Sequence, residues 1–199
     1  MDSGHSVPAS RYVLFWSLAA AGCAIDLAVK HWMFSQRALL EGEVWWLVPG
    51  HAGLQLSLNE GALFGMGQGN TWLFAACSAA AALTIPAWLF LFGAASDRAL
   101  TAALGALMGG VLGNLYDRTG MPGLDWGAFD PTRAGEPVHA VRDFFLVAWR
   151  WDEDWLQRIV WPNFNVADAL LVCGAIALLA LSMRKQDGDG GRVAEKLAR

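Results

Sequence analysis

Two isolated aspartates lie in otherwise apolar stretches in the second half of the chain. Asp168 is near the start of an apolar run that continues to Met183, and Asp143 lies upstream, between Arg142 and Phe144. A carboxylate at membrane depth is costly unless it is paired or hydrated, so such a residue indicates a functional site. If the two carboxyl groups converge, one can ionise while the other keeps its proton, because like charges a few Å apart cannot both form. The charged member can take a proton from a water that attacks a carbonyl, and the protonated member can polarise that carbonyl.

Spacing alone leaves a structural alternative open, since aspartates near helix ends also serve as caps or interface residues. Asn165 lies three residues before Asp168 on the same helix face, where its amide can hydrogen-bond a carboxylate or a peptide backbone. Asp26 and Lys30 are four residues apart, a spacing that allows an ion pair on one helix face. We interpret that pair as a structural salt bridge rather than as a catalytic one.

Two further groups of polar residues lie where apolar segments end. Asn114 and Arg118 are four apart, and Arg118 can either extend to water or hold a group of a substrate. Asn59 and Gly61 lie in the glycine-containing stretch 59–65, where glycines permit a turn and the close approach of another backbone.

Several classes of function lack their usual residues. The four histidines are scattered without a His-Glu-x-x-His pattern, and the three cysteines lie in apolar runs without metal-ligand spacing. We therefore expect no metal, no cofactor and no disulfide. The formal net charge of −4 and the lack of a basic block disfavour nucleic-acid binding.

The composition is that of an all-α polytopic membrane protein with one domain. Hydrophobic residues make up 55% and charged residues 16% of the chain, whereas soluble domains carry about 25% charged residues. Four apolar segments are each long enough to cross a hydrocarbon core of about 30 Å. We predict spans at 12–33, 72–92, 99–116 and 164–183, followed by a cytoplasmic tail over 184–199.

Four spans put both termini on the same side of the membrane. Arg11, Arg98 and Arg184 flank the ends that would share this side, so the positive-inside rule makes it cytoplasmic. The segments 34–71 and 117–163 then face outward. Within the third span, glycines spaced four apart predict close helix packing: Gly105, Gly109 and Gly113.

The outward segments contain patterns of secondary structure. Residues 54–58 alternate apolar and polar side chains, which predicts a strand, and residues 45–48 are its expected partner in a small extramembrane sheet. The tryptophan-rich segment 144–162 is expected to lie along the interface as an amphipathic helix.

On these residues the chain resembles the lipoprotein signal peptidases, or type II signal peptidases, a bacterial family of four-span aspartic proteases. Four blocks carry the resemblance: Asp26-x-x-x-Lys30, Asn59-Glu60-Gly61-Ala62-Leu63-Phe64-Gly65, Gly109-Gly110-Val111-Leu112-Gly113-Asn114-Leu115-Tyr116-Asp117-Arg118, and Val141-Arg142-Asp143-Phe144 with Phe164-Asn165-Val166-Ala167-Asp168. The resemblance implies that Asp143 and Asp168 are the catalytic pair, with Asp26 and Lys30 supporting the site. It also implies a set of substrate-site residues: Asn59, Gly61, Asn114, Arg118 and Asn165.

The resemblance also implies a substrate and a location. The substrate is a prolipoprotein whose cysteine carries a diacylglyceryl group, and cleavage just before that cysteine releases the signal peptide. The enzyme lies in the inner membrane among lipids, with its active site facing outward. A single four-span bundle needs no partner subunit, so we expect a monomer. A small sheet after span one and an interfacial helix before span four also belong to the family.

Two features depart from the family pattern. The segment 119–140 is longer than we expect and is interpreted as either a lid over the acids or a second surface. Arg142 directly precedes Asp143, where a neutral residue is expected. In an extended segment the Arg142 side chain would point away from Asp143; otherwise it would favour the charged form of that acid.

Three alternatives compete with peptidase activity. The stretch ending in Cys23 is an imperfect lipobox, so the chain could itself be a lipoprotein, although cleavage there would separate most of span one from Asp26 and Lys30. A transporter or proton channel could use Asp26, Lys30, Asp143 and Asp168 as a relay, but span two has few polar residues to continue a path. The third alternative is a membrane scaffold without activity.

Overall fold

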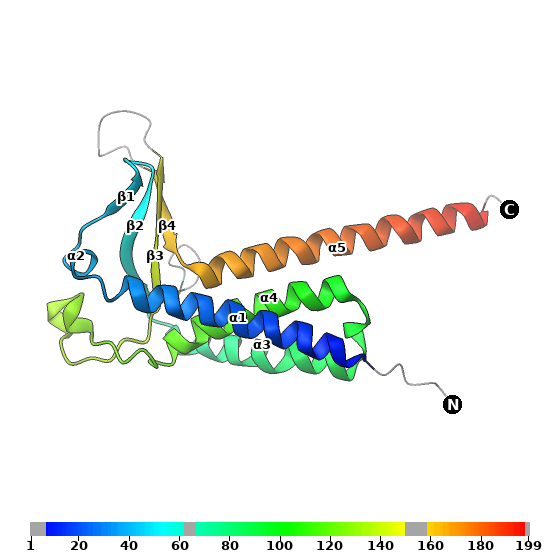
Figure 1. Cartoon of the computed structure of the whole chain (residues 1–199), viewed down its shortest axis with the longest axis horizontal. Helices are drawn as coiled ribbons and strands as arrows, with labels where there is room; N and C mark the ends of the chain where they lie inside the picture. The colour runs from blue at the N-terminus through cyan, green and yellow to red at the C-terminus, as the bar shows by residue number, and fades with distance from the viewer. Residues whose placement is uncertain (1–6, 62–66, 150–158, 198–199) are drawn as a thin grey trace.

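Four long helices lie along one direction, and a small sheet stands at one end of them (Figure 1). The computed structural model describes residues 7–61, 67–149 and 159–197. The helices are α1 (Ala9–Met33), α3 (Thr71–Leu91), α4 (Arg98–Arg118) and α5 (Val166–Leu197). Each contains a stretch long and apolar enough to cross a membrane, which in α5 is Val166–Arg184. A helix satisfies its own backbone polar groups, as a segment within hydrocarbon must.

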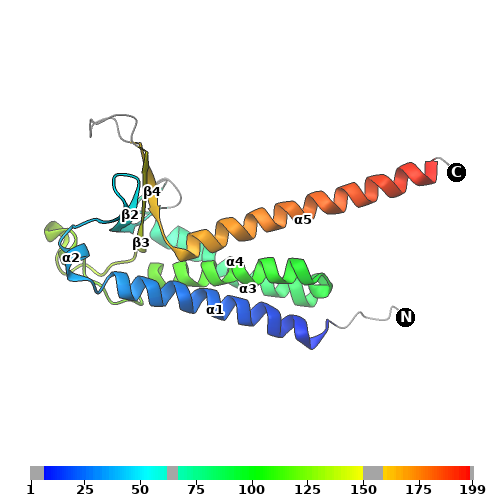
Figure 2. The same ribbon diagram turned by 45° about the horizontal axis from the view of Figure 1, so that its top comes forward.

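Each of the four predicted spans corresponds to one of these helices, with small shifts at the ends. The fourth helix begins at Val166 rather than at residue 164, because the preceding residues end a strand. The tail predicted over 184–199 continues α5 as far as Leu197, and α5 extends beyond the other helices (Figure 2). The start of α1 and the end of α5 both lie away from the sheet, as an even number of spans predicts.

The sheet has four antiparallel strands in the order in which they occur along the chain. They are β1 (Trp45–Val48), β2 (Ala52–Asn59), β3 (Val141–Trp149) and β4 (Ile159–Phe164). The predicted pairing of residues 45–48 with the second strand is confirmed.

The interfacial helix expected over 144–162 is wrong wherever the structure describes that segment. Residues 144–149 belong to β3 and residues 159–162 to β4, while 150–158 lie outside the described residues. The run from Phe144 to Val147 consists of aromatic, β-branched and leucine residues, which pack well on a pleated sheet. Strand β2 supplies the hydrogen-bonding edge for them, and the register pairs Ser57 with Asp143.

Helix α4 packs closely against its neighbours through glycines, as the spacing predicts. A Cβ on Gly109 would lie 3.0 Å from the Cα of Gly22 in α1. A Cβ on Gly110 would meet the Ala167 carbonyl oxygen in α5, and one on Gly113 would meet the Asp26 carboxylate. The glycines therefore let α4 bring polar groups of α1 and α5 together at one level.

The sheet is covered by two short segments. Helix α2 (Arg37–Leu40) contributes to an apolar cluster beneath β3: Met33, Phe34, Leu39 and Phe144. The segment after α4 folds into two short 3-10 turns, η3 (Trp126–Ala128) and η4 (Pro131–Arg133). Buried Trp126 packs with Val138 and Ala140 against Leu58 of β2. The long segment 119–140 therefore forms a layer packed on the sheet.

The close approach of α1 and α4 predicts the effect of Gly109→Val. The new side chain would meet backbone atoms of Ala19, Gly22 and Cys23, which cannot rotate away. We expect a loss of about 1–3 kcal/mol of stability, measured as a lower midpoint of thermal unfolding in detergent. Ala76→Val adds similar volume on an exposed face of α3 and is the control. Equal midpoints for the two variants would contradict this packing.

Candidate active site

Asp143 and Asp168 both accept hydrogen bonds from a single residue, Asn165. Its side-chain Nδ2 donates to Asp143 Oδ1 at 2.6 Å, and its backbone N–H donates to Asp168 Oδ2 at 3.1 Å. Asp143 and Asn165 are buried, whereas Asp168 is half-buried and lines a cavity. Two acids from a strand and a helix are thus brought together, as the hypothesis of convergence requires.

The local sequence explains why helix α5 begins at this point. Asn165 precedes the first helical residue, and its Oδ1 accepts the N–H of Asp168 at 2.9 Å. Asp168 in turn accepts the N–H of Asn165, so the two residues form a reciprocal capping box. A carboxylate in the first turn also interacts favourably with the helix dipole. The structural alternative is therefore correct too: Asp168 caps a helix and belongs to the acid pair.

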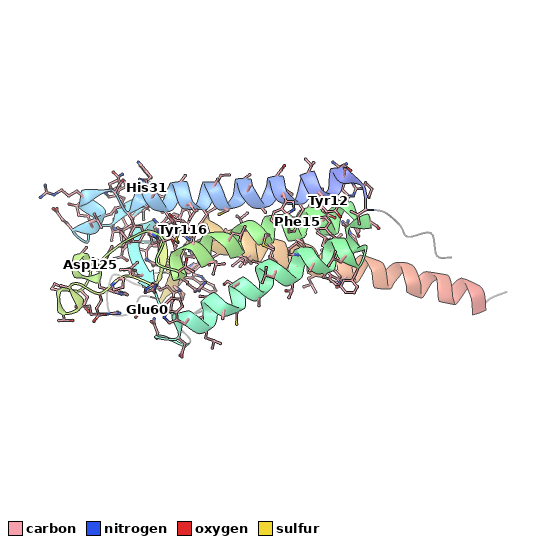
Figure 3. All side chains as sticks on the ribbon, turned by 90° about the horizontal axis from the view of Figure 1, so that it is seen from below. Tyr12, Phe15, His31, Glu60, Tyr116 and Asp125 are labelled. Atoms are coloured by element: carbon pink, nitrogen blue, oxygen red, sulfur yellow. The ribbon has the colours of Figure 1, made fainter. Side chains whose placement is uncertain are left out.

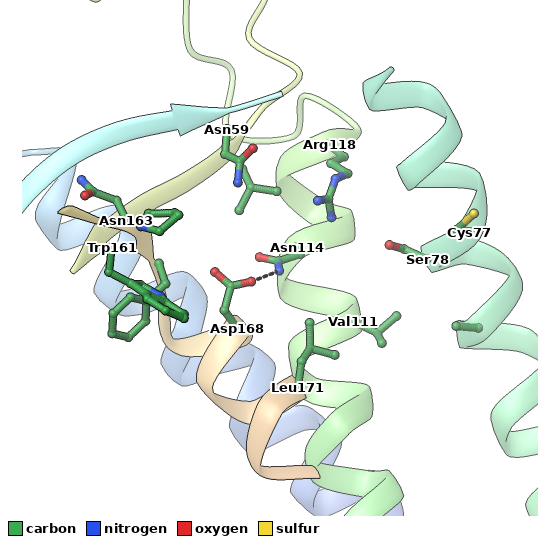
Figure 4. Close-up of a pocket in the computed structure, with 14 residues that line it drawn as sticks. Asn59, Cys77, Ser78, Val111, Asn114, Arg118, Trp161, Asn163, Asp168 and Leu171 are labelled. Carbon is green, nitrogen blue, oxygen red and sulfur yellow. Dashed lines mark hydrogen bonds between the residues drawn. The ribbon is translucent and has the colours of Figure 1, made fainter. Parts of the chain in front are cut away.

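Asn114 holds the second oxygen of Asp168. Its Nδ2 donates to Asp168 Oδ1 at 2.9 Å (Figure 4). Its Oδ1 accepts from Lys30 Nζ at 2.9 Å and from Asn165 Nδ2 at 3.3 Å. Because two donors face Oδ1, the amide NH2 must be the end that faces Asp168. Lys30 thus orients Asn114 toward the acid pair.

Lys30 lies at the centre of a fully buried set of charges. Its Nζ is 2.7 Å from Asp26 Oδ2 and 2.9 Å from Asp117 Oδ2, which confirms the ion pair expected within the first span. Arg142 neutralises the other side of Asp117, with Nε at 2.9 Å and Nη2 at 2.8 Å from Oδ1. Two acids and two bases balance here, as buried charges require.

The same charges connect the elements that carry the acid pair. Asp26 Oδ1 accepts the N–H of Ala167, one of the free N–H groups at the start of α5, at 2.8 Å. Asp117 Oδ2 accepts the backbone N–H of Arg142 in β3 at 3.1 Å. Helices α1, α4 and α5 and strand β3 are therefore joined at one point.

Asp117 is not among the site residues predicted from the sequence. Its spacing of three from Asn114 places both on one face of α4, and that was the available signal. For Arg142 the extended alternative is correct, because β3 directs its side chain to Asp117 and away from the cavity-facing Asp143.

Asp143 is the member of the pair that holds a proton more tightly than usual. Burial raises the pKa of its carboxyl to about 7, and the negative charge of Asp168 acts in the same direction. Hydrogen bonds from Asn165 and Asn59 and the charge of Lys30 oppose this rise in pKa. Asp143 therefore keeps its proton until the pH rises to about 7, and this behaviour depends on the neighbouring acid.

Asn59 and Gly61 contact the site from the end of β2. Asn59 Nδ2 donates to Asp143 Oδ2 at 3.3 Å, and its Oδ1 accepts the N–H of Gly61 at 2.9 Å. Arg118 Nη2 donates to the Gly61 carbonyl at 3.2 Å, and its guanidinium lies 5.6 Å from the Phe74 ring centre. Within the described residues, the buried Nε of Arg118 has no hydrogen-bond partner. The Arg118 side chain is thus directed at the Gly61 carbonyl and the Phe74 ring.

Two cavities flank the acid pair. The first, about 340 Å³, is bordered by α3, α4 and α5 and has Asp168 and Arg118 at its polar end and Val111 and Leu171 at its apolar end (Figure 4). The second, about 420 Å³, lies against the sheet and is lined by Asp143 and polar residues of β2. Asn59 lines both cavities. An extended chain passing from one cavity to the other would therefore cross both carboxyl groups.

The described part of the chain holds no cluster of three or more histidine, cysteine, aspartate or glutamate side chains placed to bind a metal ion.

The fold and the site together define a polytopic membrane protein with an acid pair where its helices meet an extramembrane sheet. A sequence profile of the signal peptidase II family matches residues 18–184. The chain is 46% identical to the lipoprotein signal peptidase of Rhodopirellula baltica over 185 residues, covering 91% of this chain and 76% of that protein. It is 33% identical to the one of Rhodococcus jostii over 189 residues, covering 92% and 78%. The chain therefore belongs to the signal peptidase II family.

Comparison with solved structures shows the same fold. A bacterial membrane enzyme determined by the in meso method at 2.3 Å resolution superposes with a TM-score of 0.65 at 19% identity, over 86% of this chain and 88% of that one. A second, determined at 1.9 Å, superposes with a TM-score of 0.60 at 20% identity, over 83% and 89%.

The buried charges predict the effect of Lys30→Met. Removing Lys30 takes away the base that pairs with Asp26 and leaves Asp117 with Arg142, so we expect a loss of about 3–5 kcal/mol in stability. Thermal unfolding in detergent measures it. Arg37→Met removes a cation whose side chain is 91% exposed and should leave the midpoint nearly unchanged. If Lys30→Met and Arg37→Met unfold alike, the buried charges do not hold the bundle together.

The raised pKa of Asp143 predicts a dependence of stability on pH. A carboxyl whose pKa is higher in the folded state stabilises the fold below its ordinary pKa of 3.8, and this stabilisation is lost as pH rises through about 7. The rise in the pKa of Asp143 from 3.8 to about 7 corresponds to roughly 4 kcal/mol of folding stability at most. Asp143→Asn removes it, so the variant should gain stability relative to wild type between about pH 4 and pH 8.

The midpoints of thermal unfolding of wild type and Asp143→Asn, measured at several pH values in this range, give the difference in stability. Ionisable groups that both proteins contain contribute equally to the two midpoints and drop out of the difference. A constant difference between the two midpoints would show that Asp143 titrates as an ordinary carboxyl.

Proposed function

We propose that this protein is an aspartic endopeptidase that removes signal peptides from prolipoproteins by cleaving before a diacylglyceryl-modified cysteine. Membership of the signal peptidase II family and relatives named lipoprotein signal peptidase support the reaction. The single observation that carries the aspartic mechanism is the contact of Asn165 with both Asp143 and Asp168. It places two acids side by side in surroundings that suit one proton between them.

The two acids take different roles because their surroundings differ. Asp168 accepts hydrogen bonds on both oxygens and lies at a helix N-terminus, so it is the charged member and the base. Asp143 is buried, and its pKa near 7 makes it the protonated member. Among the described residues Asn59 is the hydrogen-bond partner of its Oδ2, at a long 3.3 Å, so we assign the proton that faces the substrate to this oxygen.

The reaction then follows general acid–base catalysis. Asp168 takes a proton from a water molecule, and the oxygen of that water bonds to the scissile carbonyl carbon. At the same time Asp143 donates a hydrogen bond to the carbonyl oxygen. The tetrahedral intermediate collapses, the C–N bond breaks, and the amine leaves with the proton that Asp168 gained. Activity requires one proton on the pair, so it declines on the alkaline side as Asp143 ionises.

The two cavities suit the two sides of the scissile bond. The apolar end of the first cavity, with Val111 and Leu171, receives the end of the signal peptide, while Arg118 and Asn59 bind its backbone carbonyls. The diacylglyceryl chains of the cysteine stay in the bilayer, so the bond must be cut at the membrane surface. Asp143 lies in β3 and Asp168 in the first turn of α5, so the acid pair is where a candidate span meets the sheet.

The four spans and the bacterial relatives make this an inner-membrane protein. We further propose that both termini are cytoplasmic, that the sheet and the acid pair face outward, and that the enzyme acts as a monomer in contact with membrane lipids. Arg11, Arg98 and Arg184 at the end away from the sheet support this orientation through the positive-inside rule.

The alternatives have less support. Cys23 lies within the continuous helix α1, and cleavage before it would detach most of a span that packs against α4. A proton relay would use Asp26 and Lys30 as mobile sites, but both are held in a balanced set of buried ion pairs.

The catalytic pair predicts the loss of activity in two variants. Asp143→Asn and Asp168→Asn should each lower kcat by about 10³-fold or more, because neither variant can hold the shared proton and a negative charge on the pair. Purified protein in detergent is incubated with a lipidated prolipoprotein, and the products are separated by size.

Glu43→Gln provides the matched control, since it removes one exposed carboxylate outside the site and should keep the wild-type rate. Folding of each variant is checked by its thermal unfolding. Near-normal cleavage by either aspartate variant would exclude the proposed mechanism.

A further inference from the structure

Arg133 connects the long segment 119–140 to the loop that follows β2. Its Nη1 and Nη2 donate to the two oxygens of Glu60 at 3.3 and 3.2 Å, and its Nε donates to Glu136 at 2.9 Å. Its guanidinium lies over the Trp126 ring, 3.9 Å from the centroid. A planar guanidinium with two parallel contacts fixes the direction of its partner as well as its distance.

The segment that carries Arg133 is itself firmly folded. Trp126 is only 8% exposed and belongs to the cluster that packs on β2. Asp125 Oδ1 accepts the N–H groups of Gly127 and Gly135 at 2.8 and 3.2 Å, which closes the loop on both sides of Arg133. Backbone hydrogen bonds from Trp126 to Glu136 and from Val138 to Leu124 complete it. Arg133 is therefore presented from a fixed platform.

Glu60 lies between two residues that contact the acid pair and its arginine. On one side, Asn59 donates to Asp143; on the other, the Gly61 carbonyl accepts from Arg118. The Glu60 carbonyl accepts the Thr71 hydroxyl at the start of α3, at 3.2 Å. Figure 3 shows Glu60 and Asp125 at the same end of the molecule as the sheet. A displacement of Glu60 would therefore move groups in the site.

We propose that Arg133 is a positioning residue for catalysis: through Glu60 it holds the Asn59 amide against Asp143 and the Gly61 carbonyl against Arg118. This inference rests on the proposed catalytic pair. It gives the segment 119–140 a role as a brace for the site, in place of a lid over it. The Arg133 and Glu60 side chains are 32% and 26% exposed, so their ion pair contributes little to global stability. Its loss should change the geometry of the site more than the fold.

The test compares Arg133→Ala and Glu60→Ala with wild type in the cleavage assay. Each should lower kcat about tenfold, with a smaller change in KM, because small displacements of catalytic groups slow the chemical step. Arg133→Lys keeps the charge but loses the paired contacts, so its kcat should lie between Arg133→Ala and wild type. The control is Arg37→Ala, which breaks an exposed Arg–Glu pair on α2 and should keep the wild-type kcat.

The dependence of kcat on pH distinguishes a positioning role for Arg133 and Glu60 from a direct effect of their charges on Asp143. Loosening the Asn59 contact removes a hydrogen bond that lowers the pKa of Asp143, so both variants should move the alkaline limb of kcat to higher pH. Their charge changes have opposite signs, so a field effect would move the two limbs in opposite directions. The groups that face Asp143 remain unchanged in both variants: Asn165 and Asp168 from the start of α5, Lys30 from α1 and Arg118 from α4.

Two results would overturn the proposal: kcat within twofold of wild type in both alanine variants, or alkaline limbs that move in opposite directions. If Arg133→Ala fails to fold, Glu60→Ala carries the same test. Activity in Asp143→Asn would instead reject the catalytic pair, so failure of the brace and failure of the mechanism give different results.

Discussion

A buried lysine is the interaction on which the rest of this structure depends. Lys30 has no exposed surface and needs nearby acceptors to compensate its charge. Asp26, Asp117 and Asn114 supply them, and each of these residues also contacts another element that carries the site. Asp26 binds the start of α5, Asp117 binds β3 through Arg142, and Asn114 binds Asp168. The glycines of α4 make this possible by letting the helices approach.

The chemistry follows from the unequal surroundings of the two acids. Asp168 lies in a capping box at a helix start and faces a cavity, whereas Asp143 lies in a buried strand. Asn165 donates hydrogen bonds to both acids, so a change in the charge or position of one acid affects the other. In the proposed mechanism one carboxyl group of such a pair is charged and the other keeps its proton, so that the two can act as base and acid. The four long helices lie on one side of the site, and the sheet lies on the other.

Much of this arrangement could be predicted from local sequence patterns. Apolar length gave the four spans, period-two alternation gave β2, and helical spacing gave the Asp26–Lys30 pair. Strands β3 and β4 could not be separated from an amphipathic helix, because tryptophan-rich segments fit either structure until a partner strand is known. The contacts that join distant segments were also out of reach. Arg133 and Glu60 are 73 residues apart, and nothing in either local pattern indicates the other.

The central claim is that Asp143 and Asp168 share one proton near neutral pH. Carbon-13 NMR of protein labelled at the aspartate side-chain carboxyl carbons, titrated in detergent micelles, tests it directly. We expect one carboxyl signal to keep its protonated shift up to about pH 7, and to vanish in Asp143→Asn. If every aspartate carboxyl signal were already in its ionised position at about pH 5, the pair would share no proton and the account would be wrong.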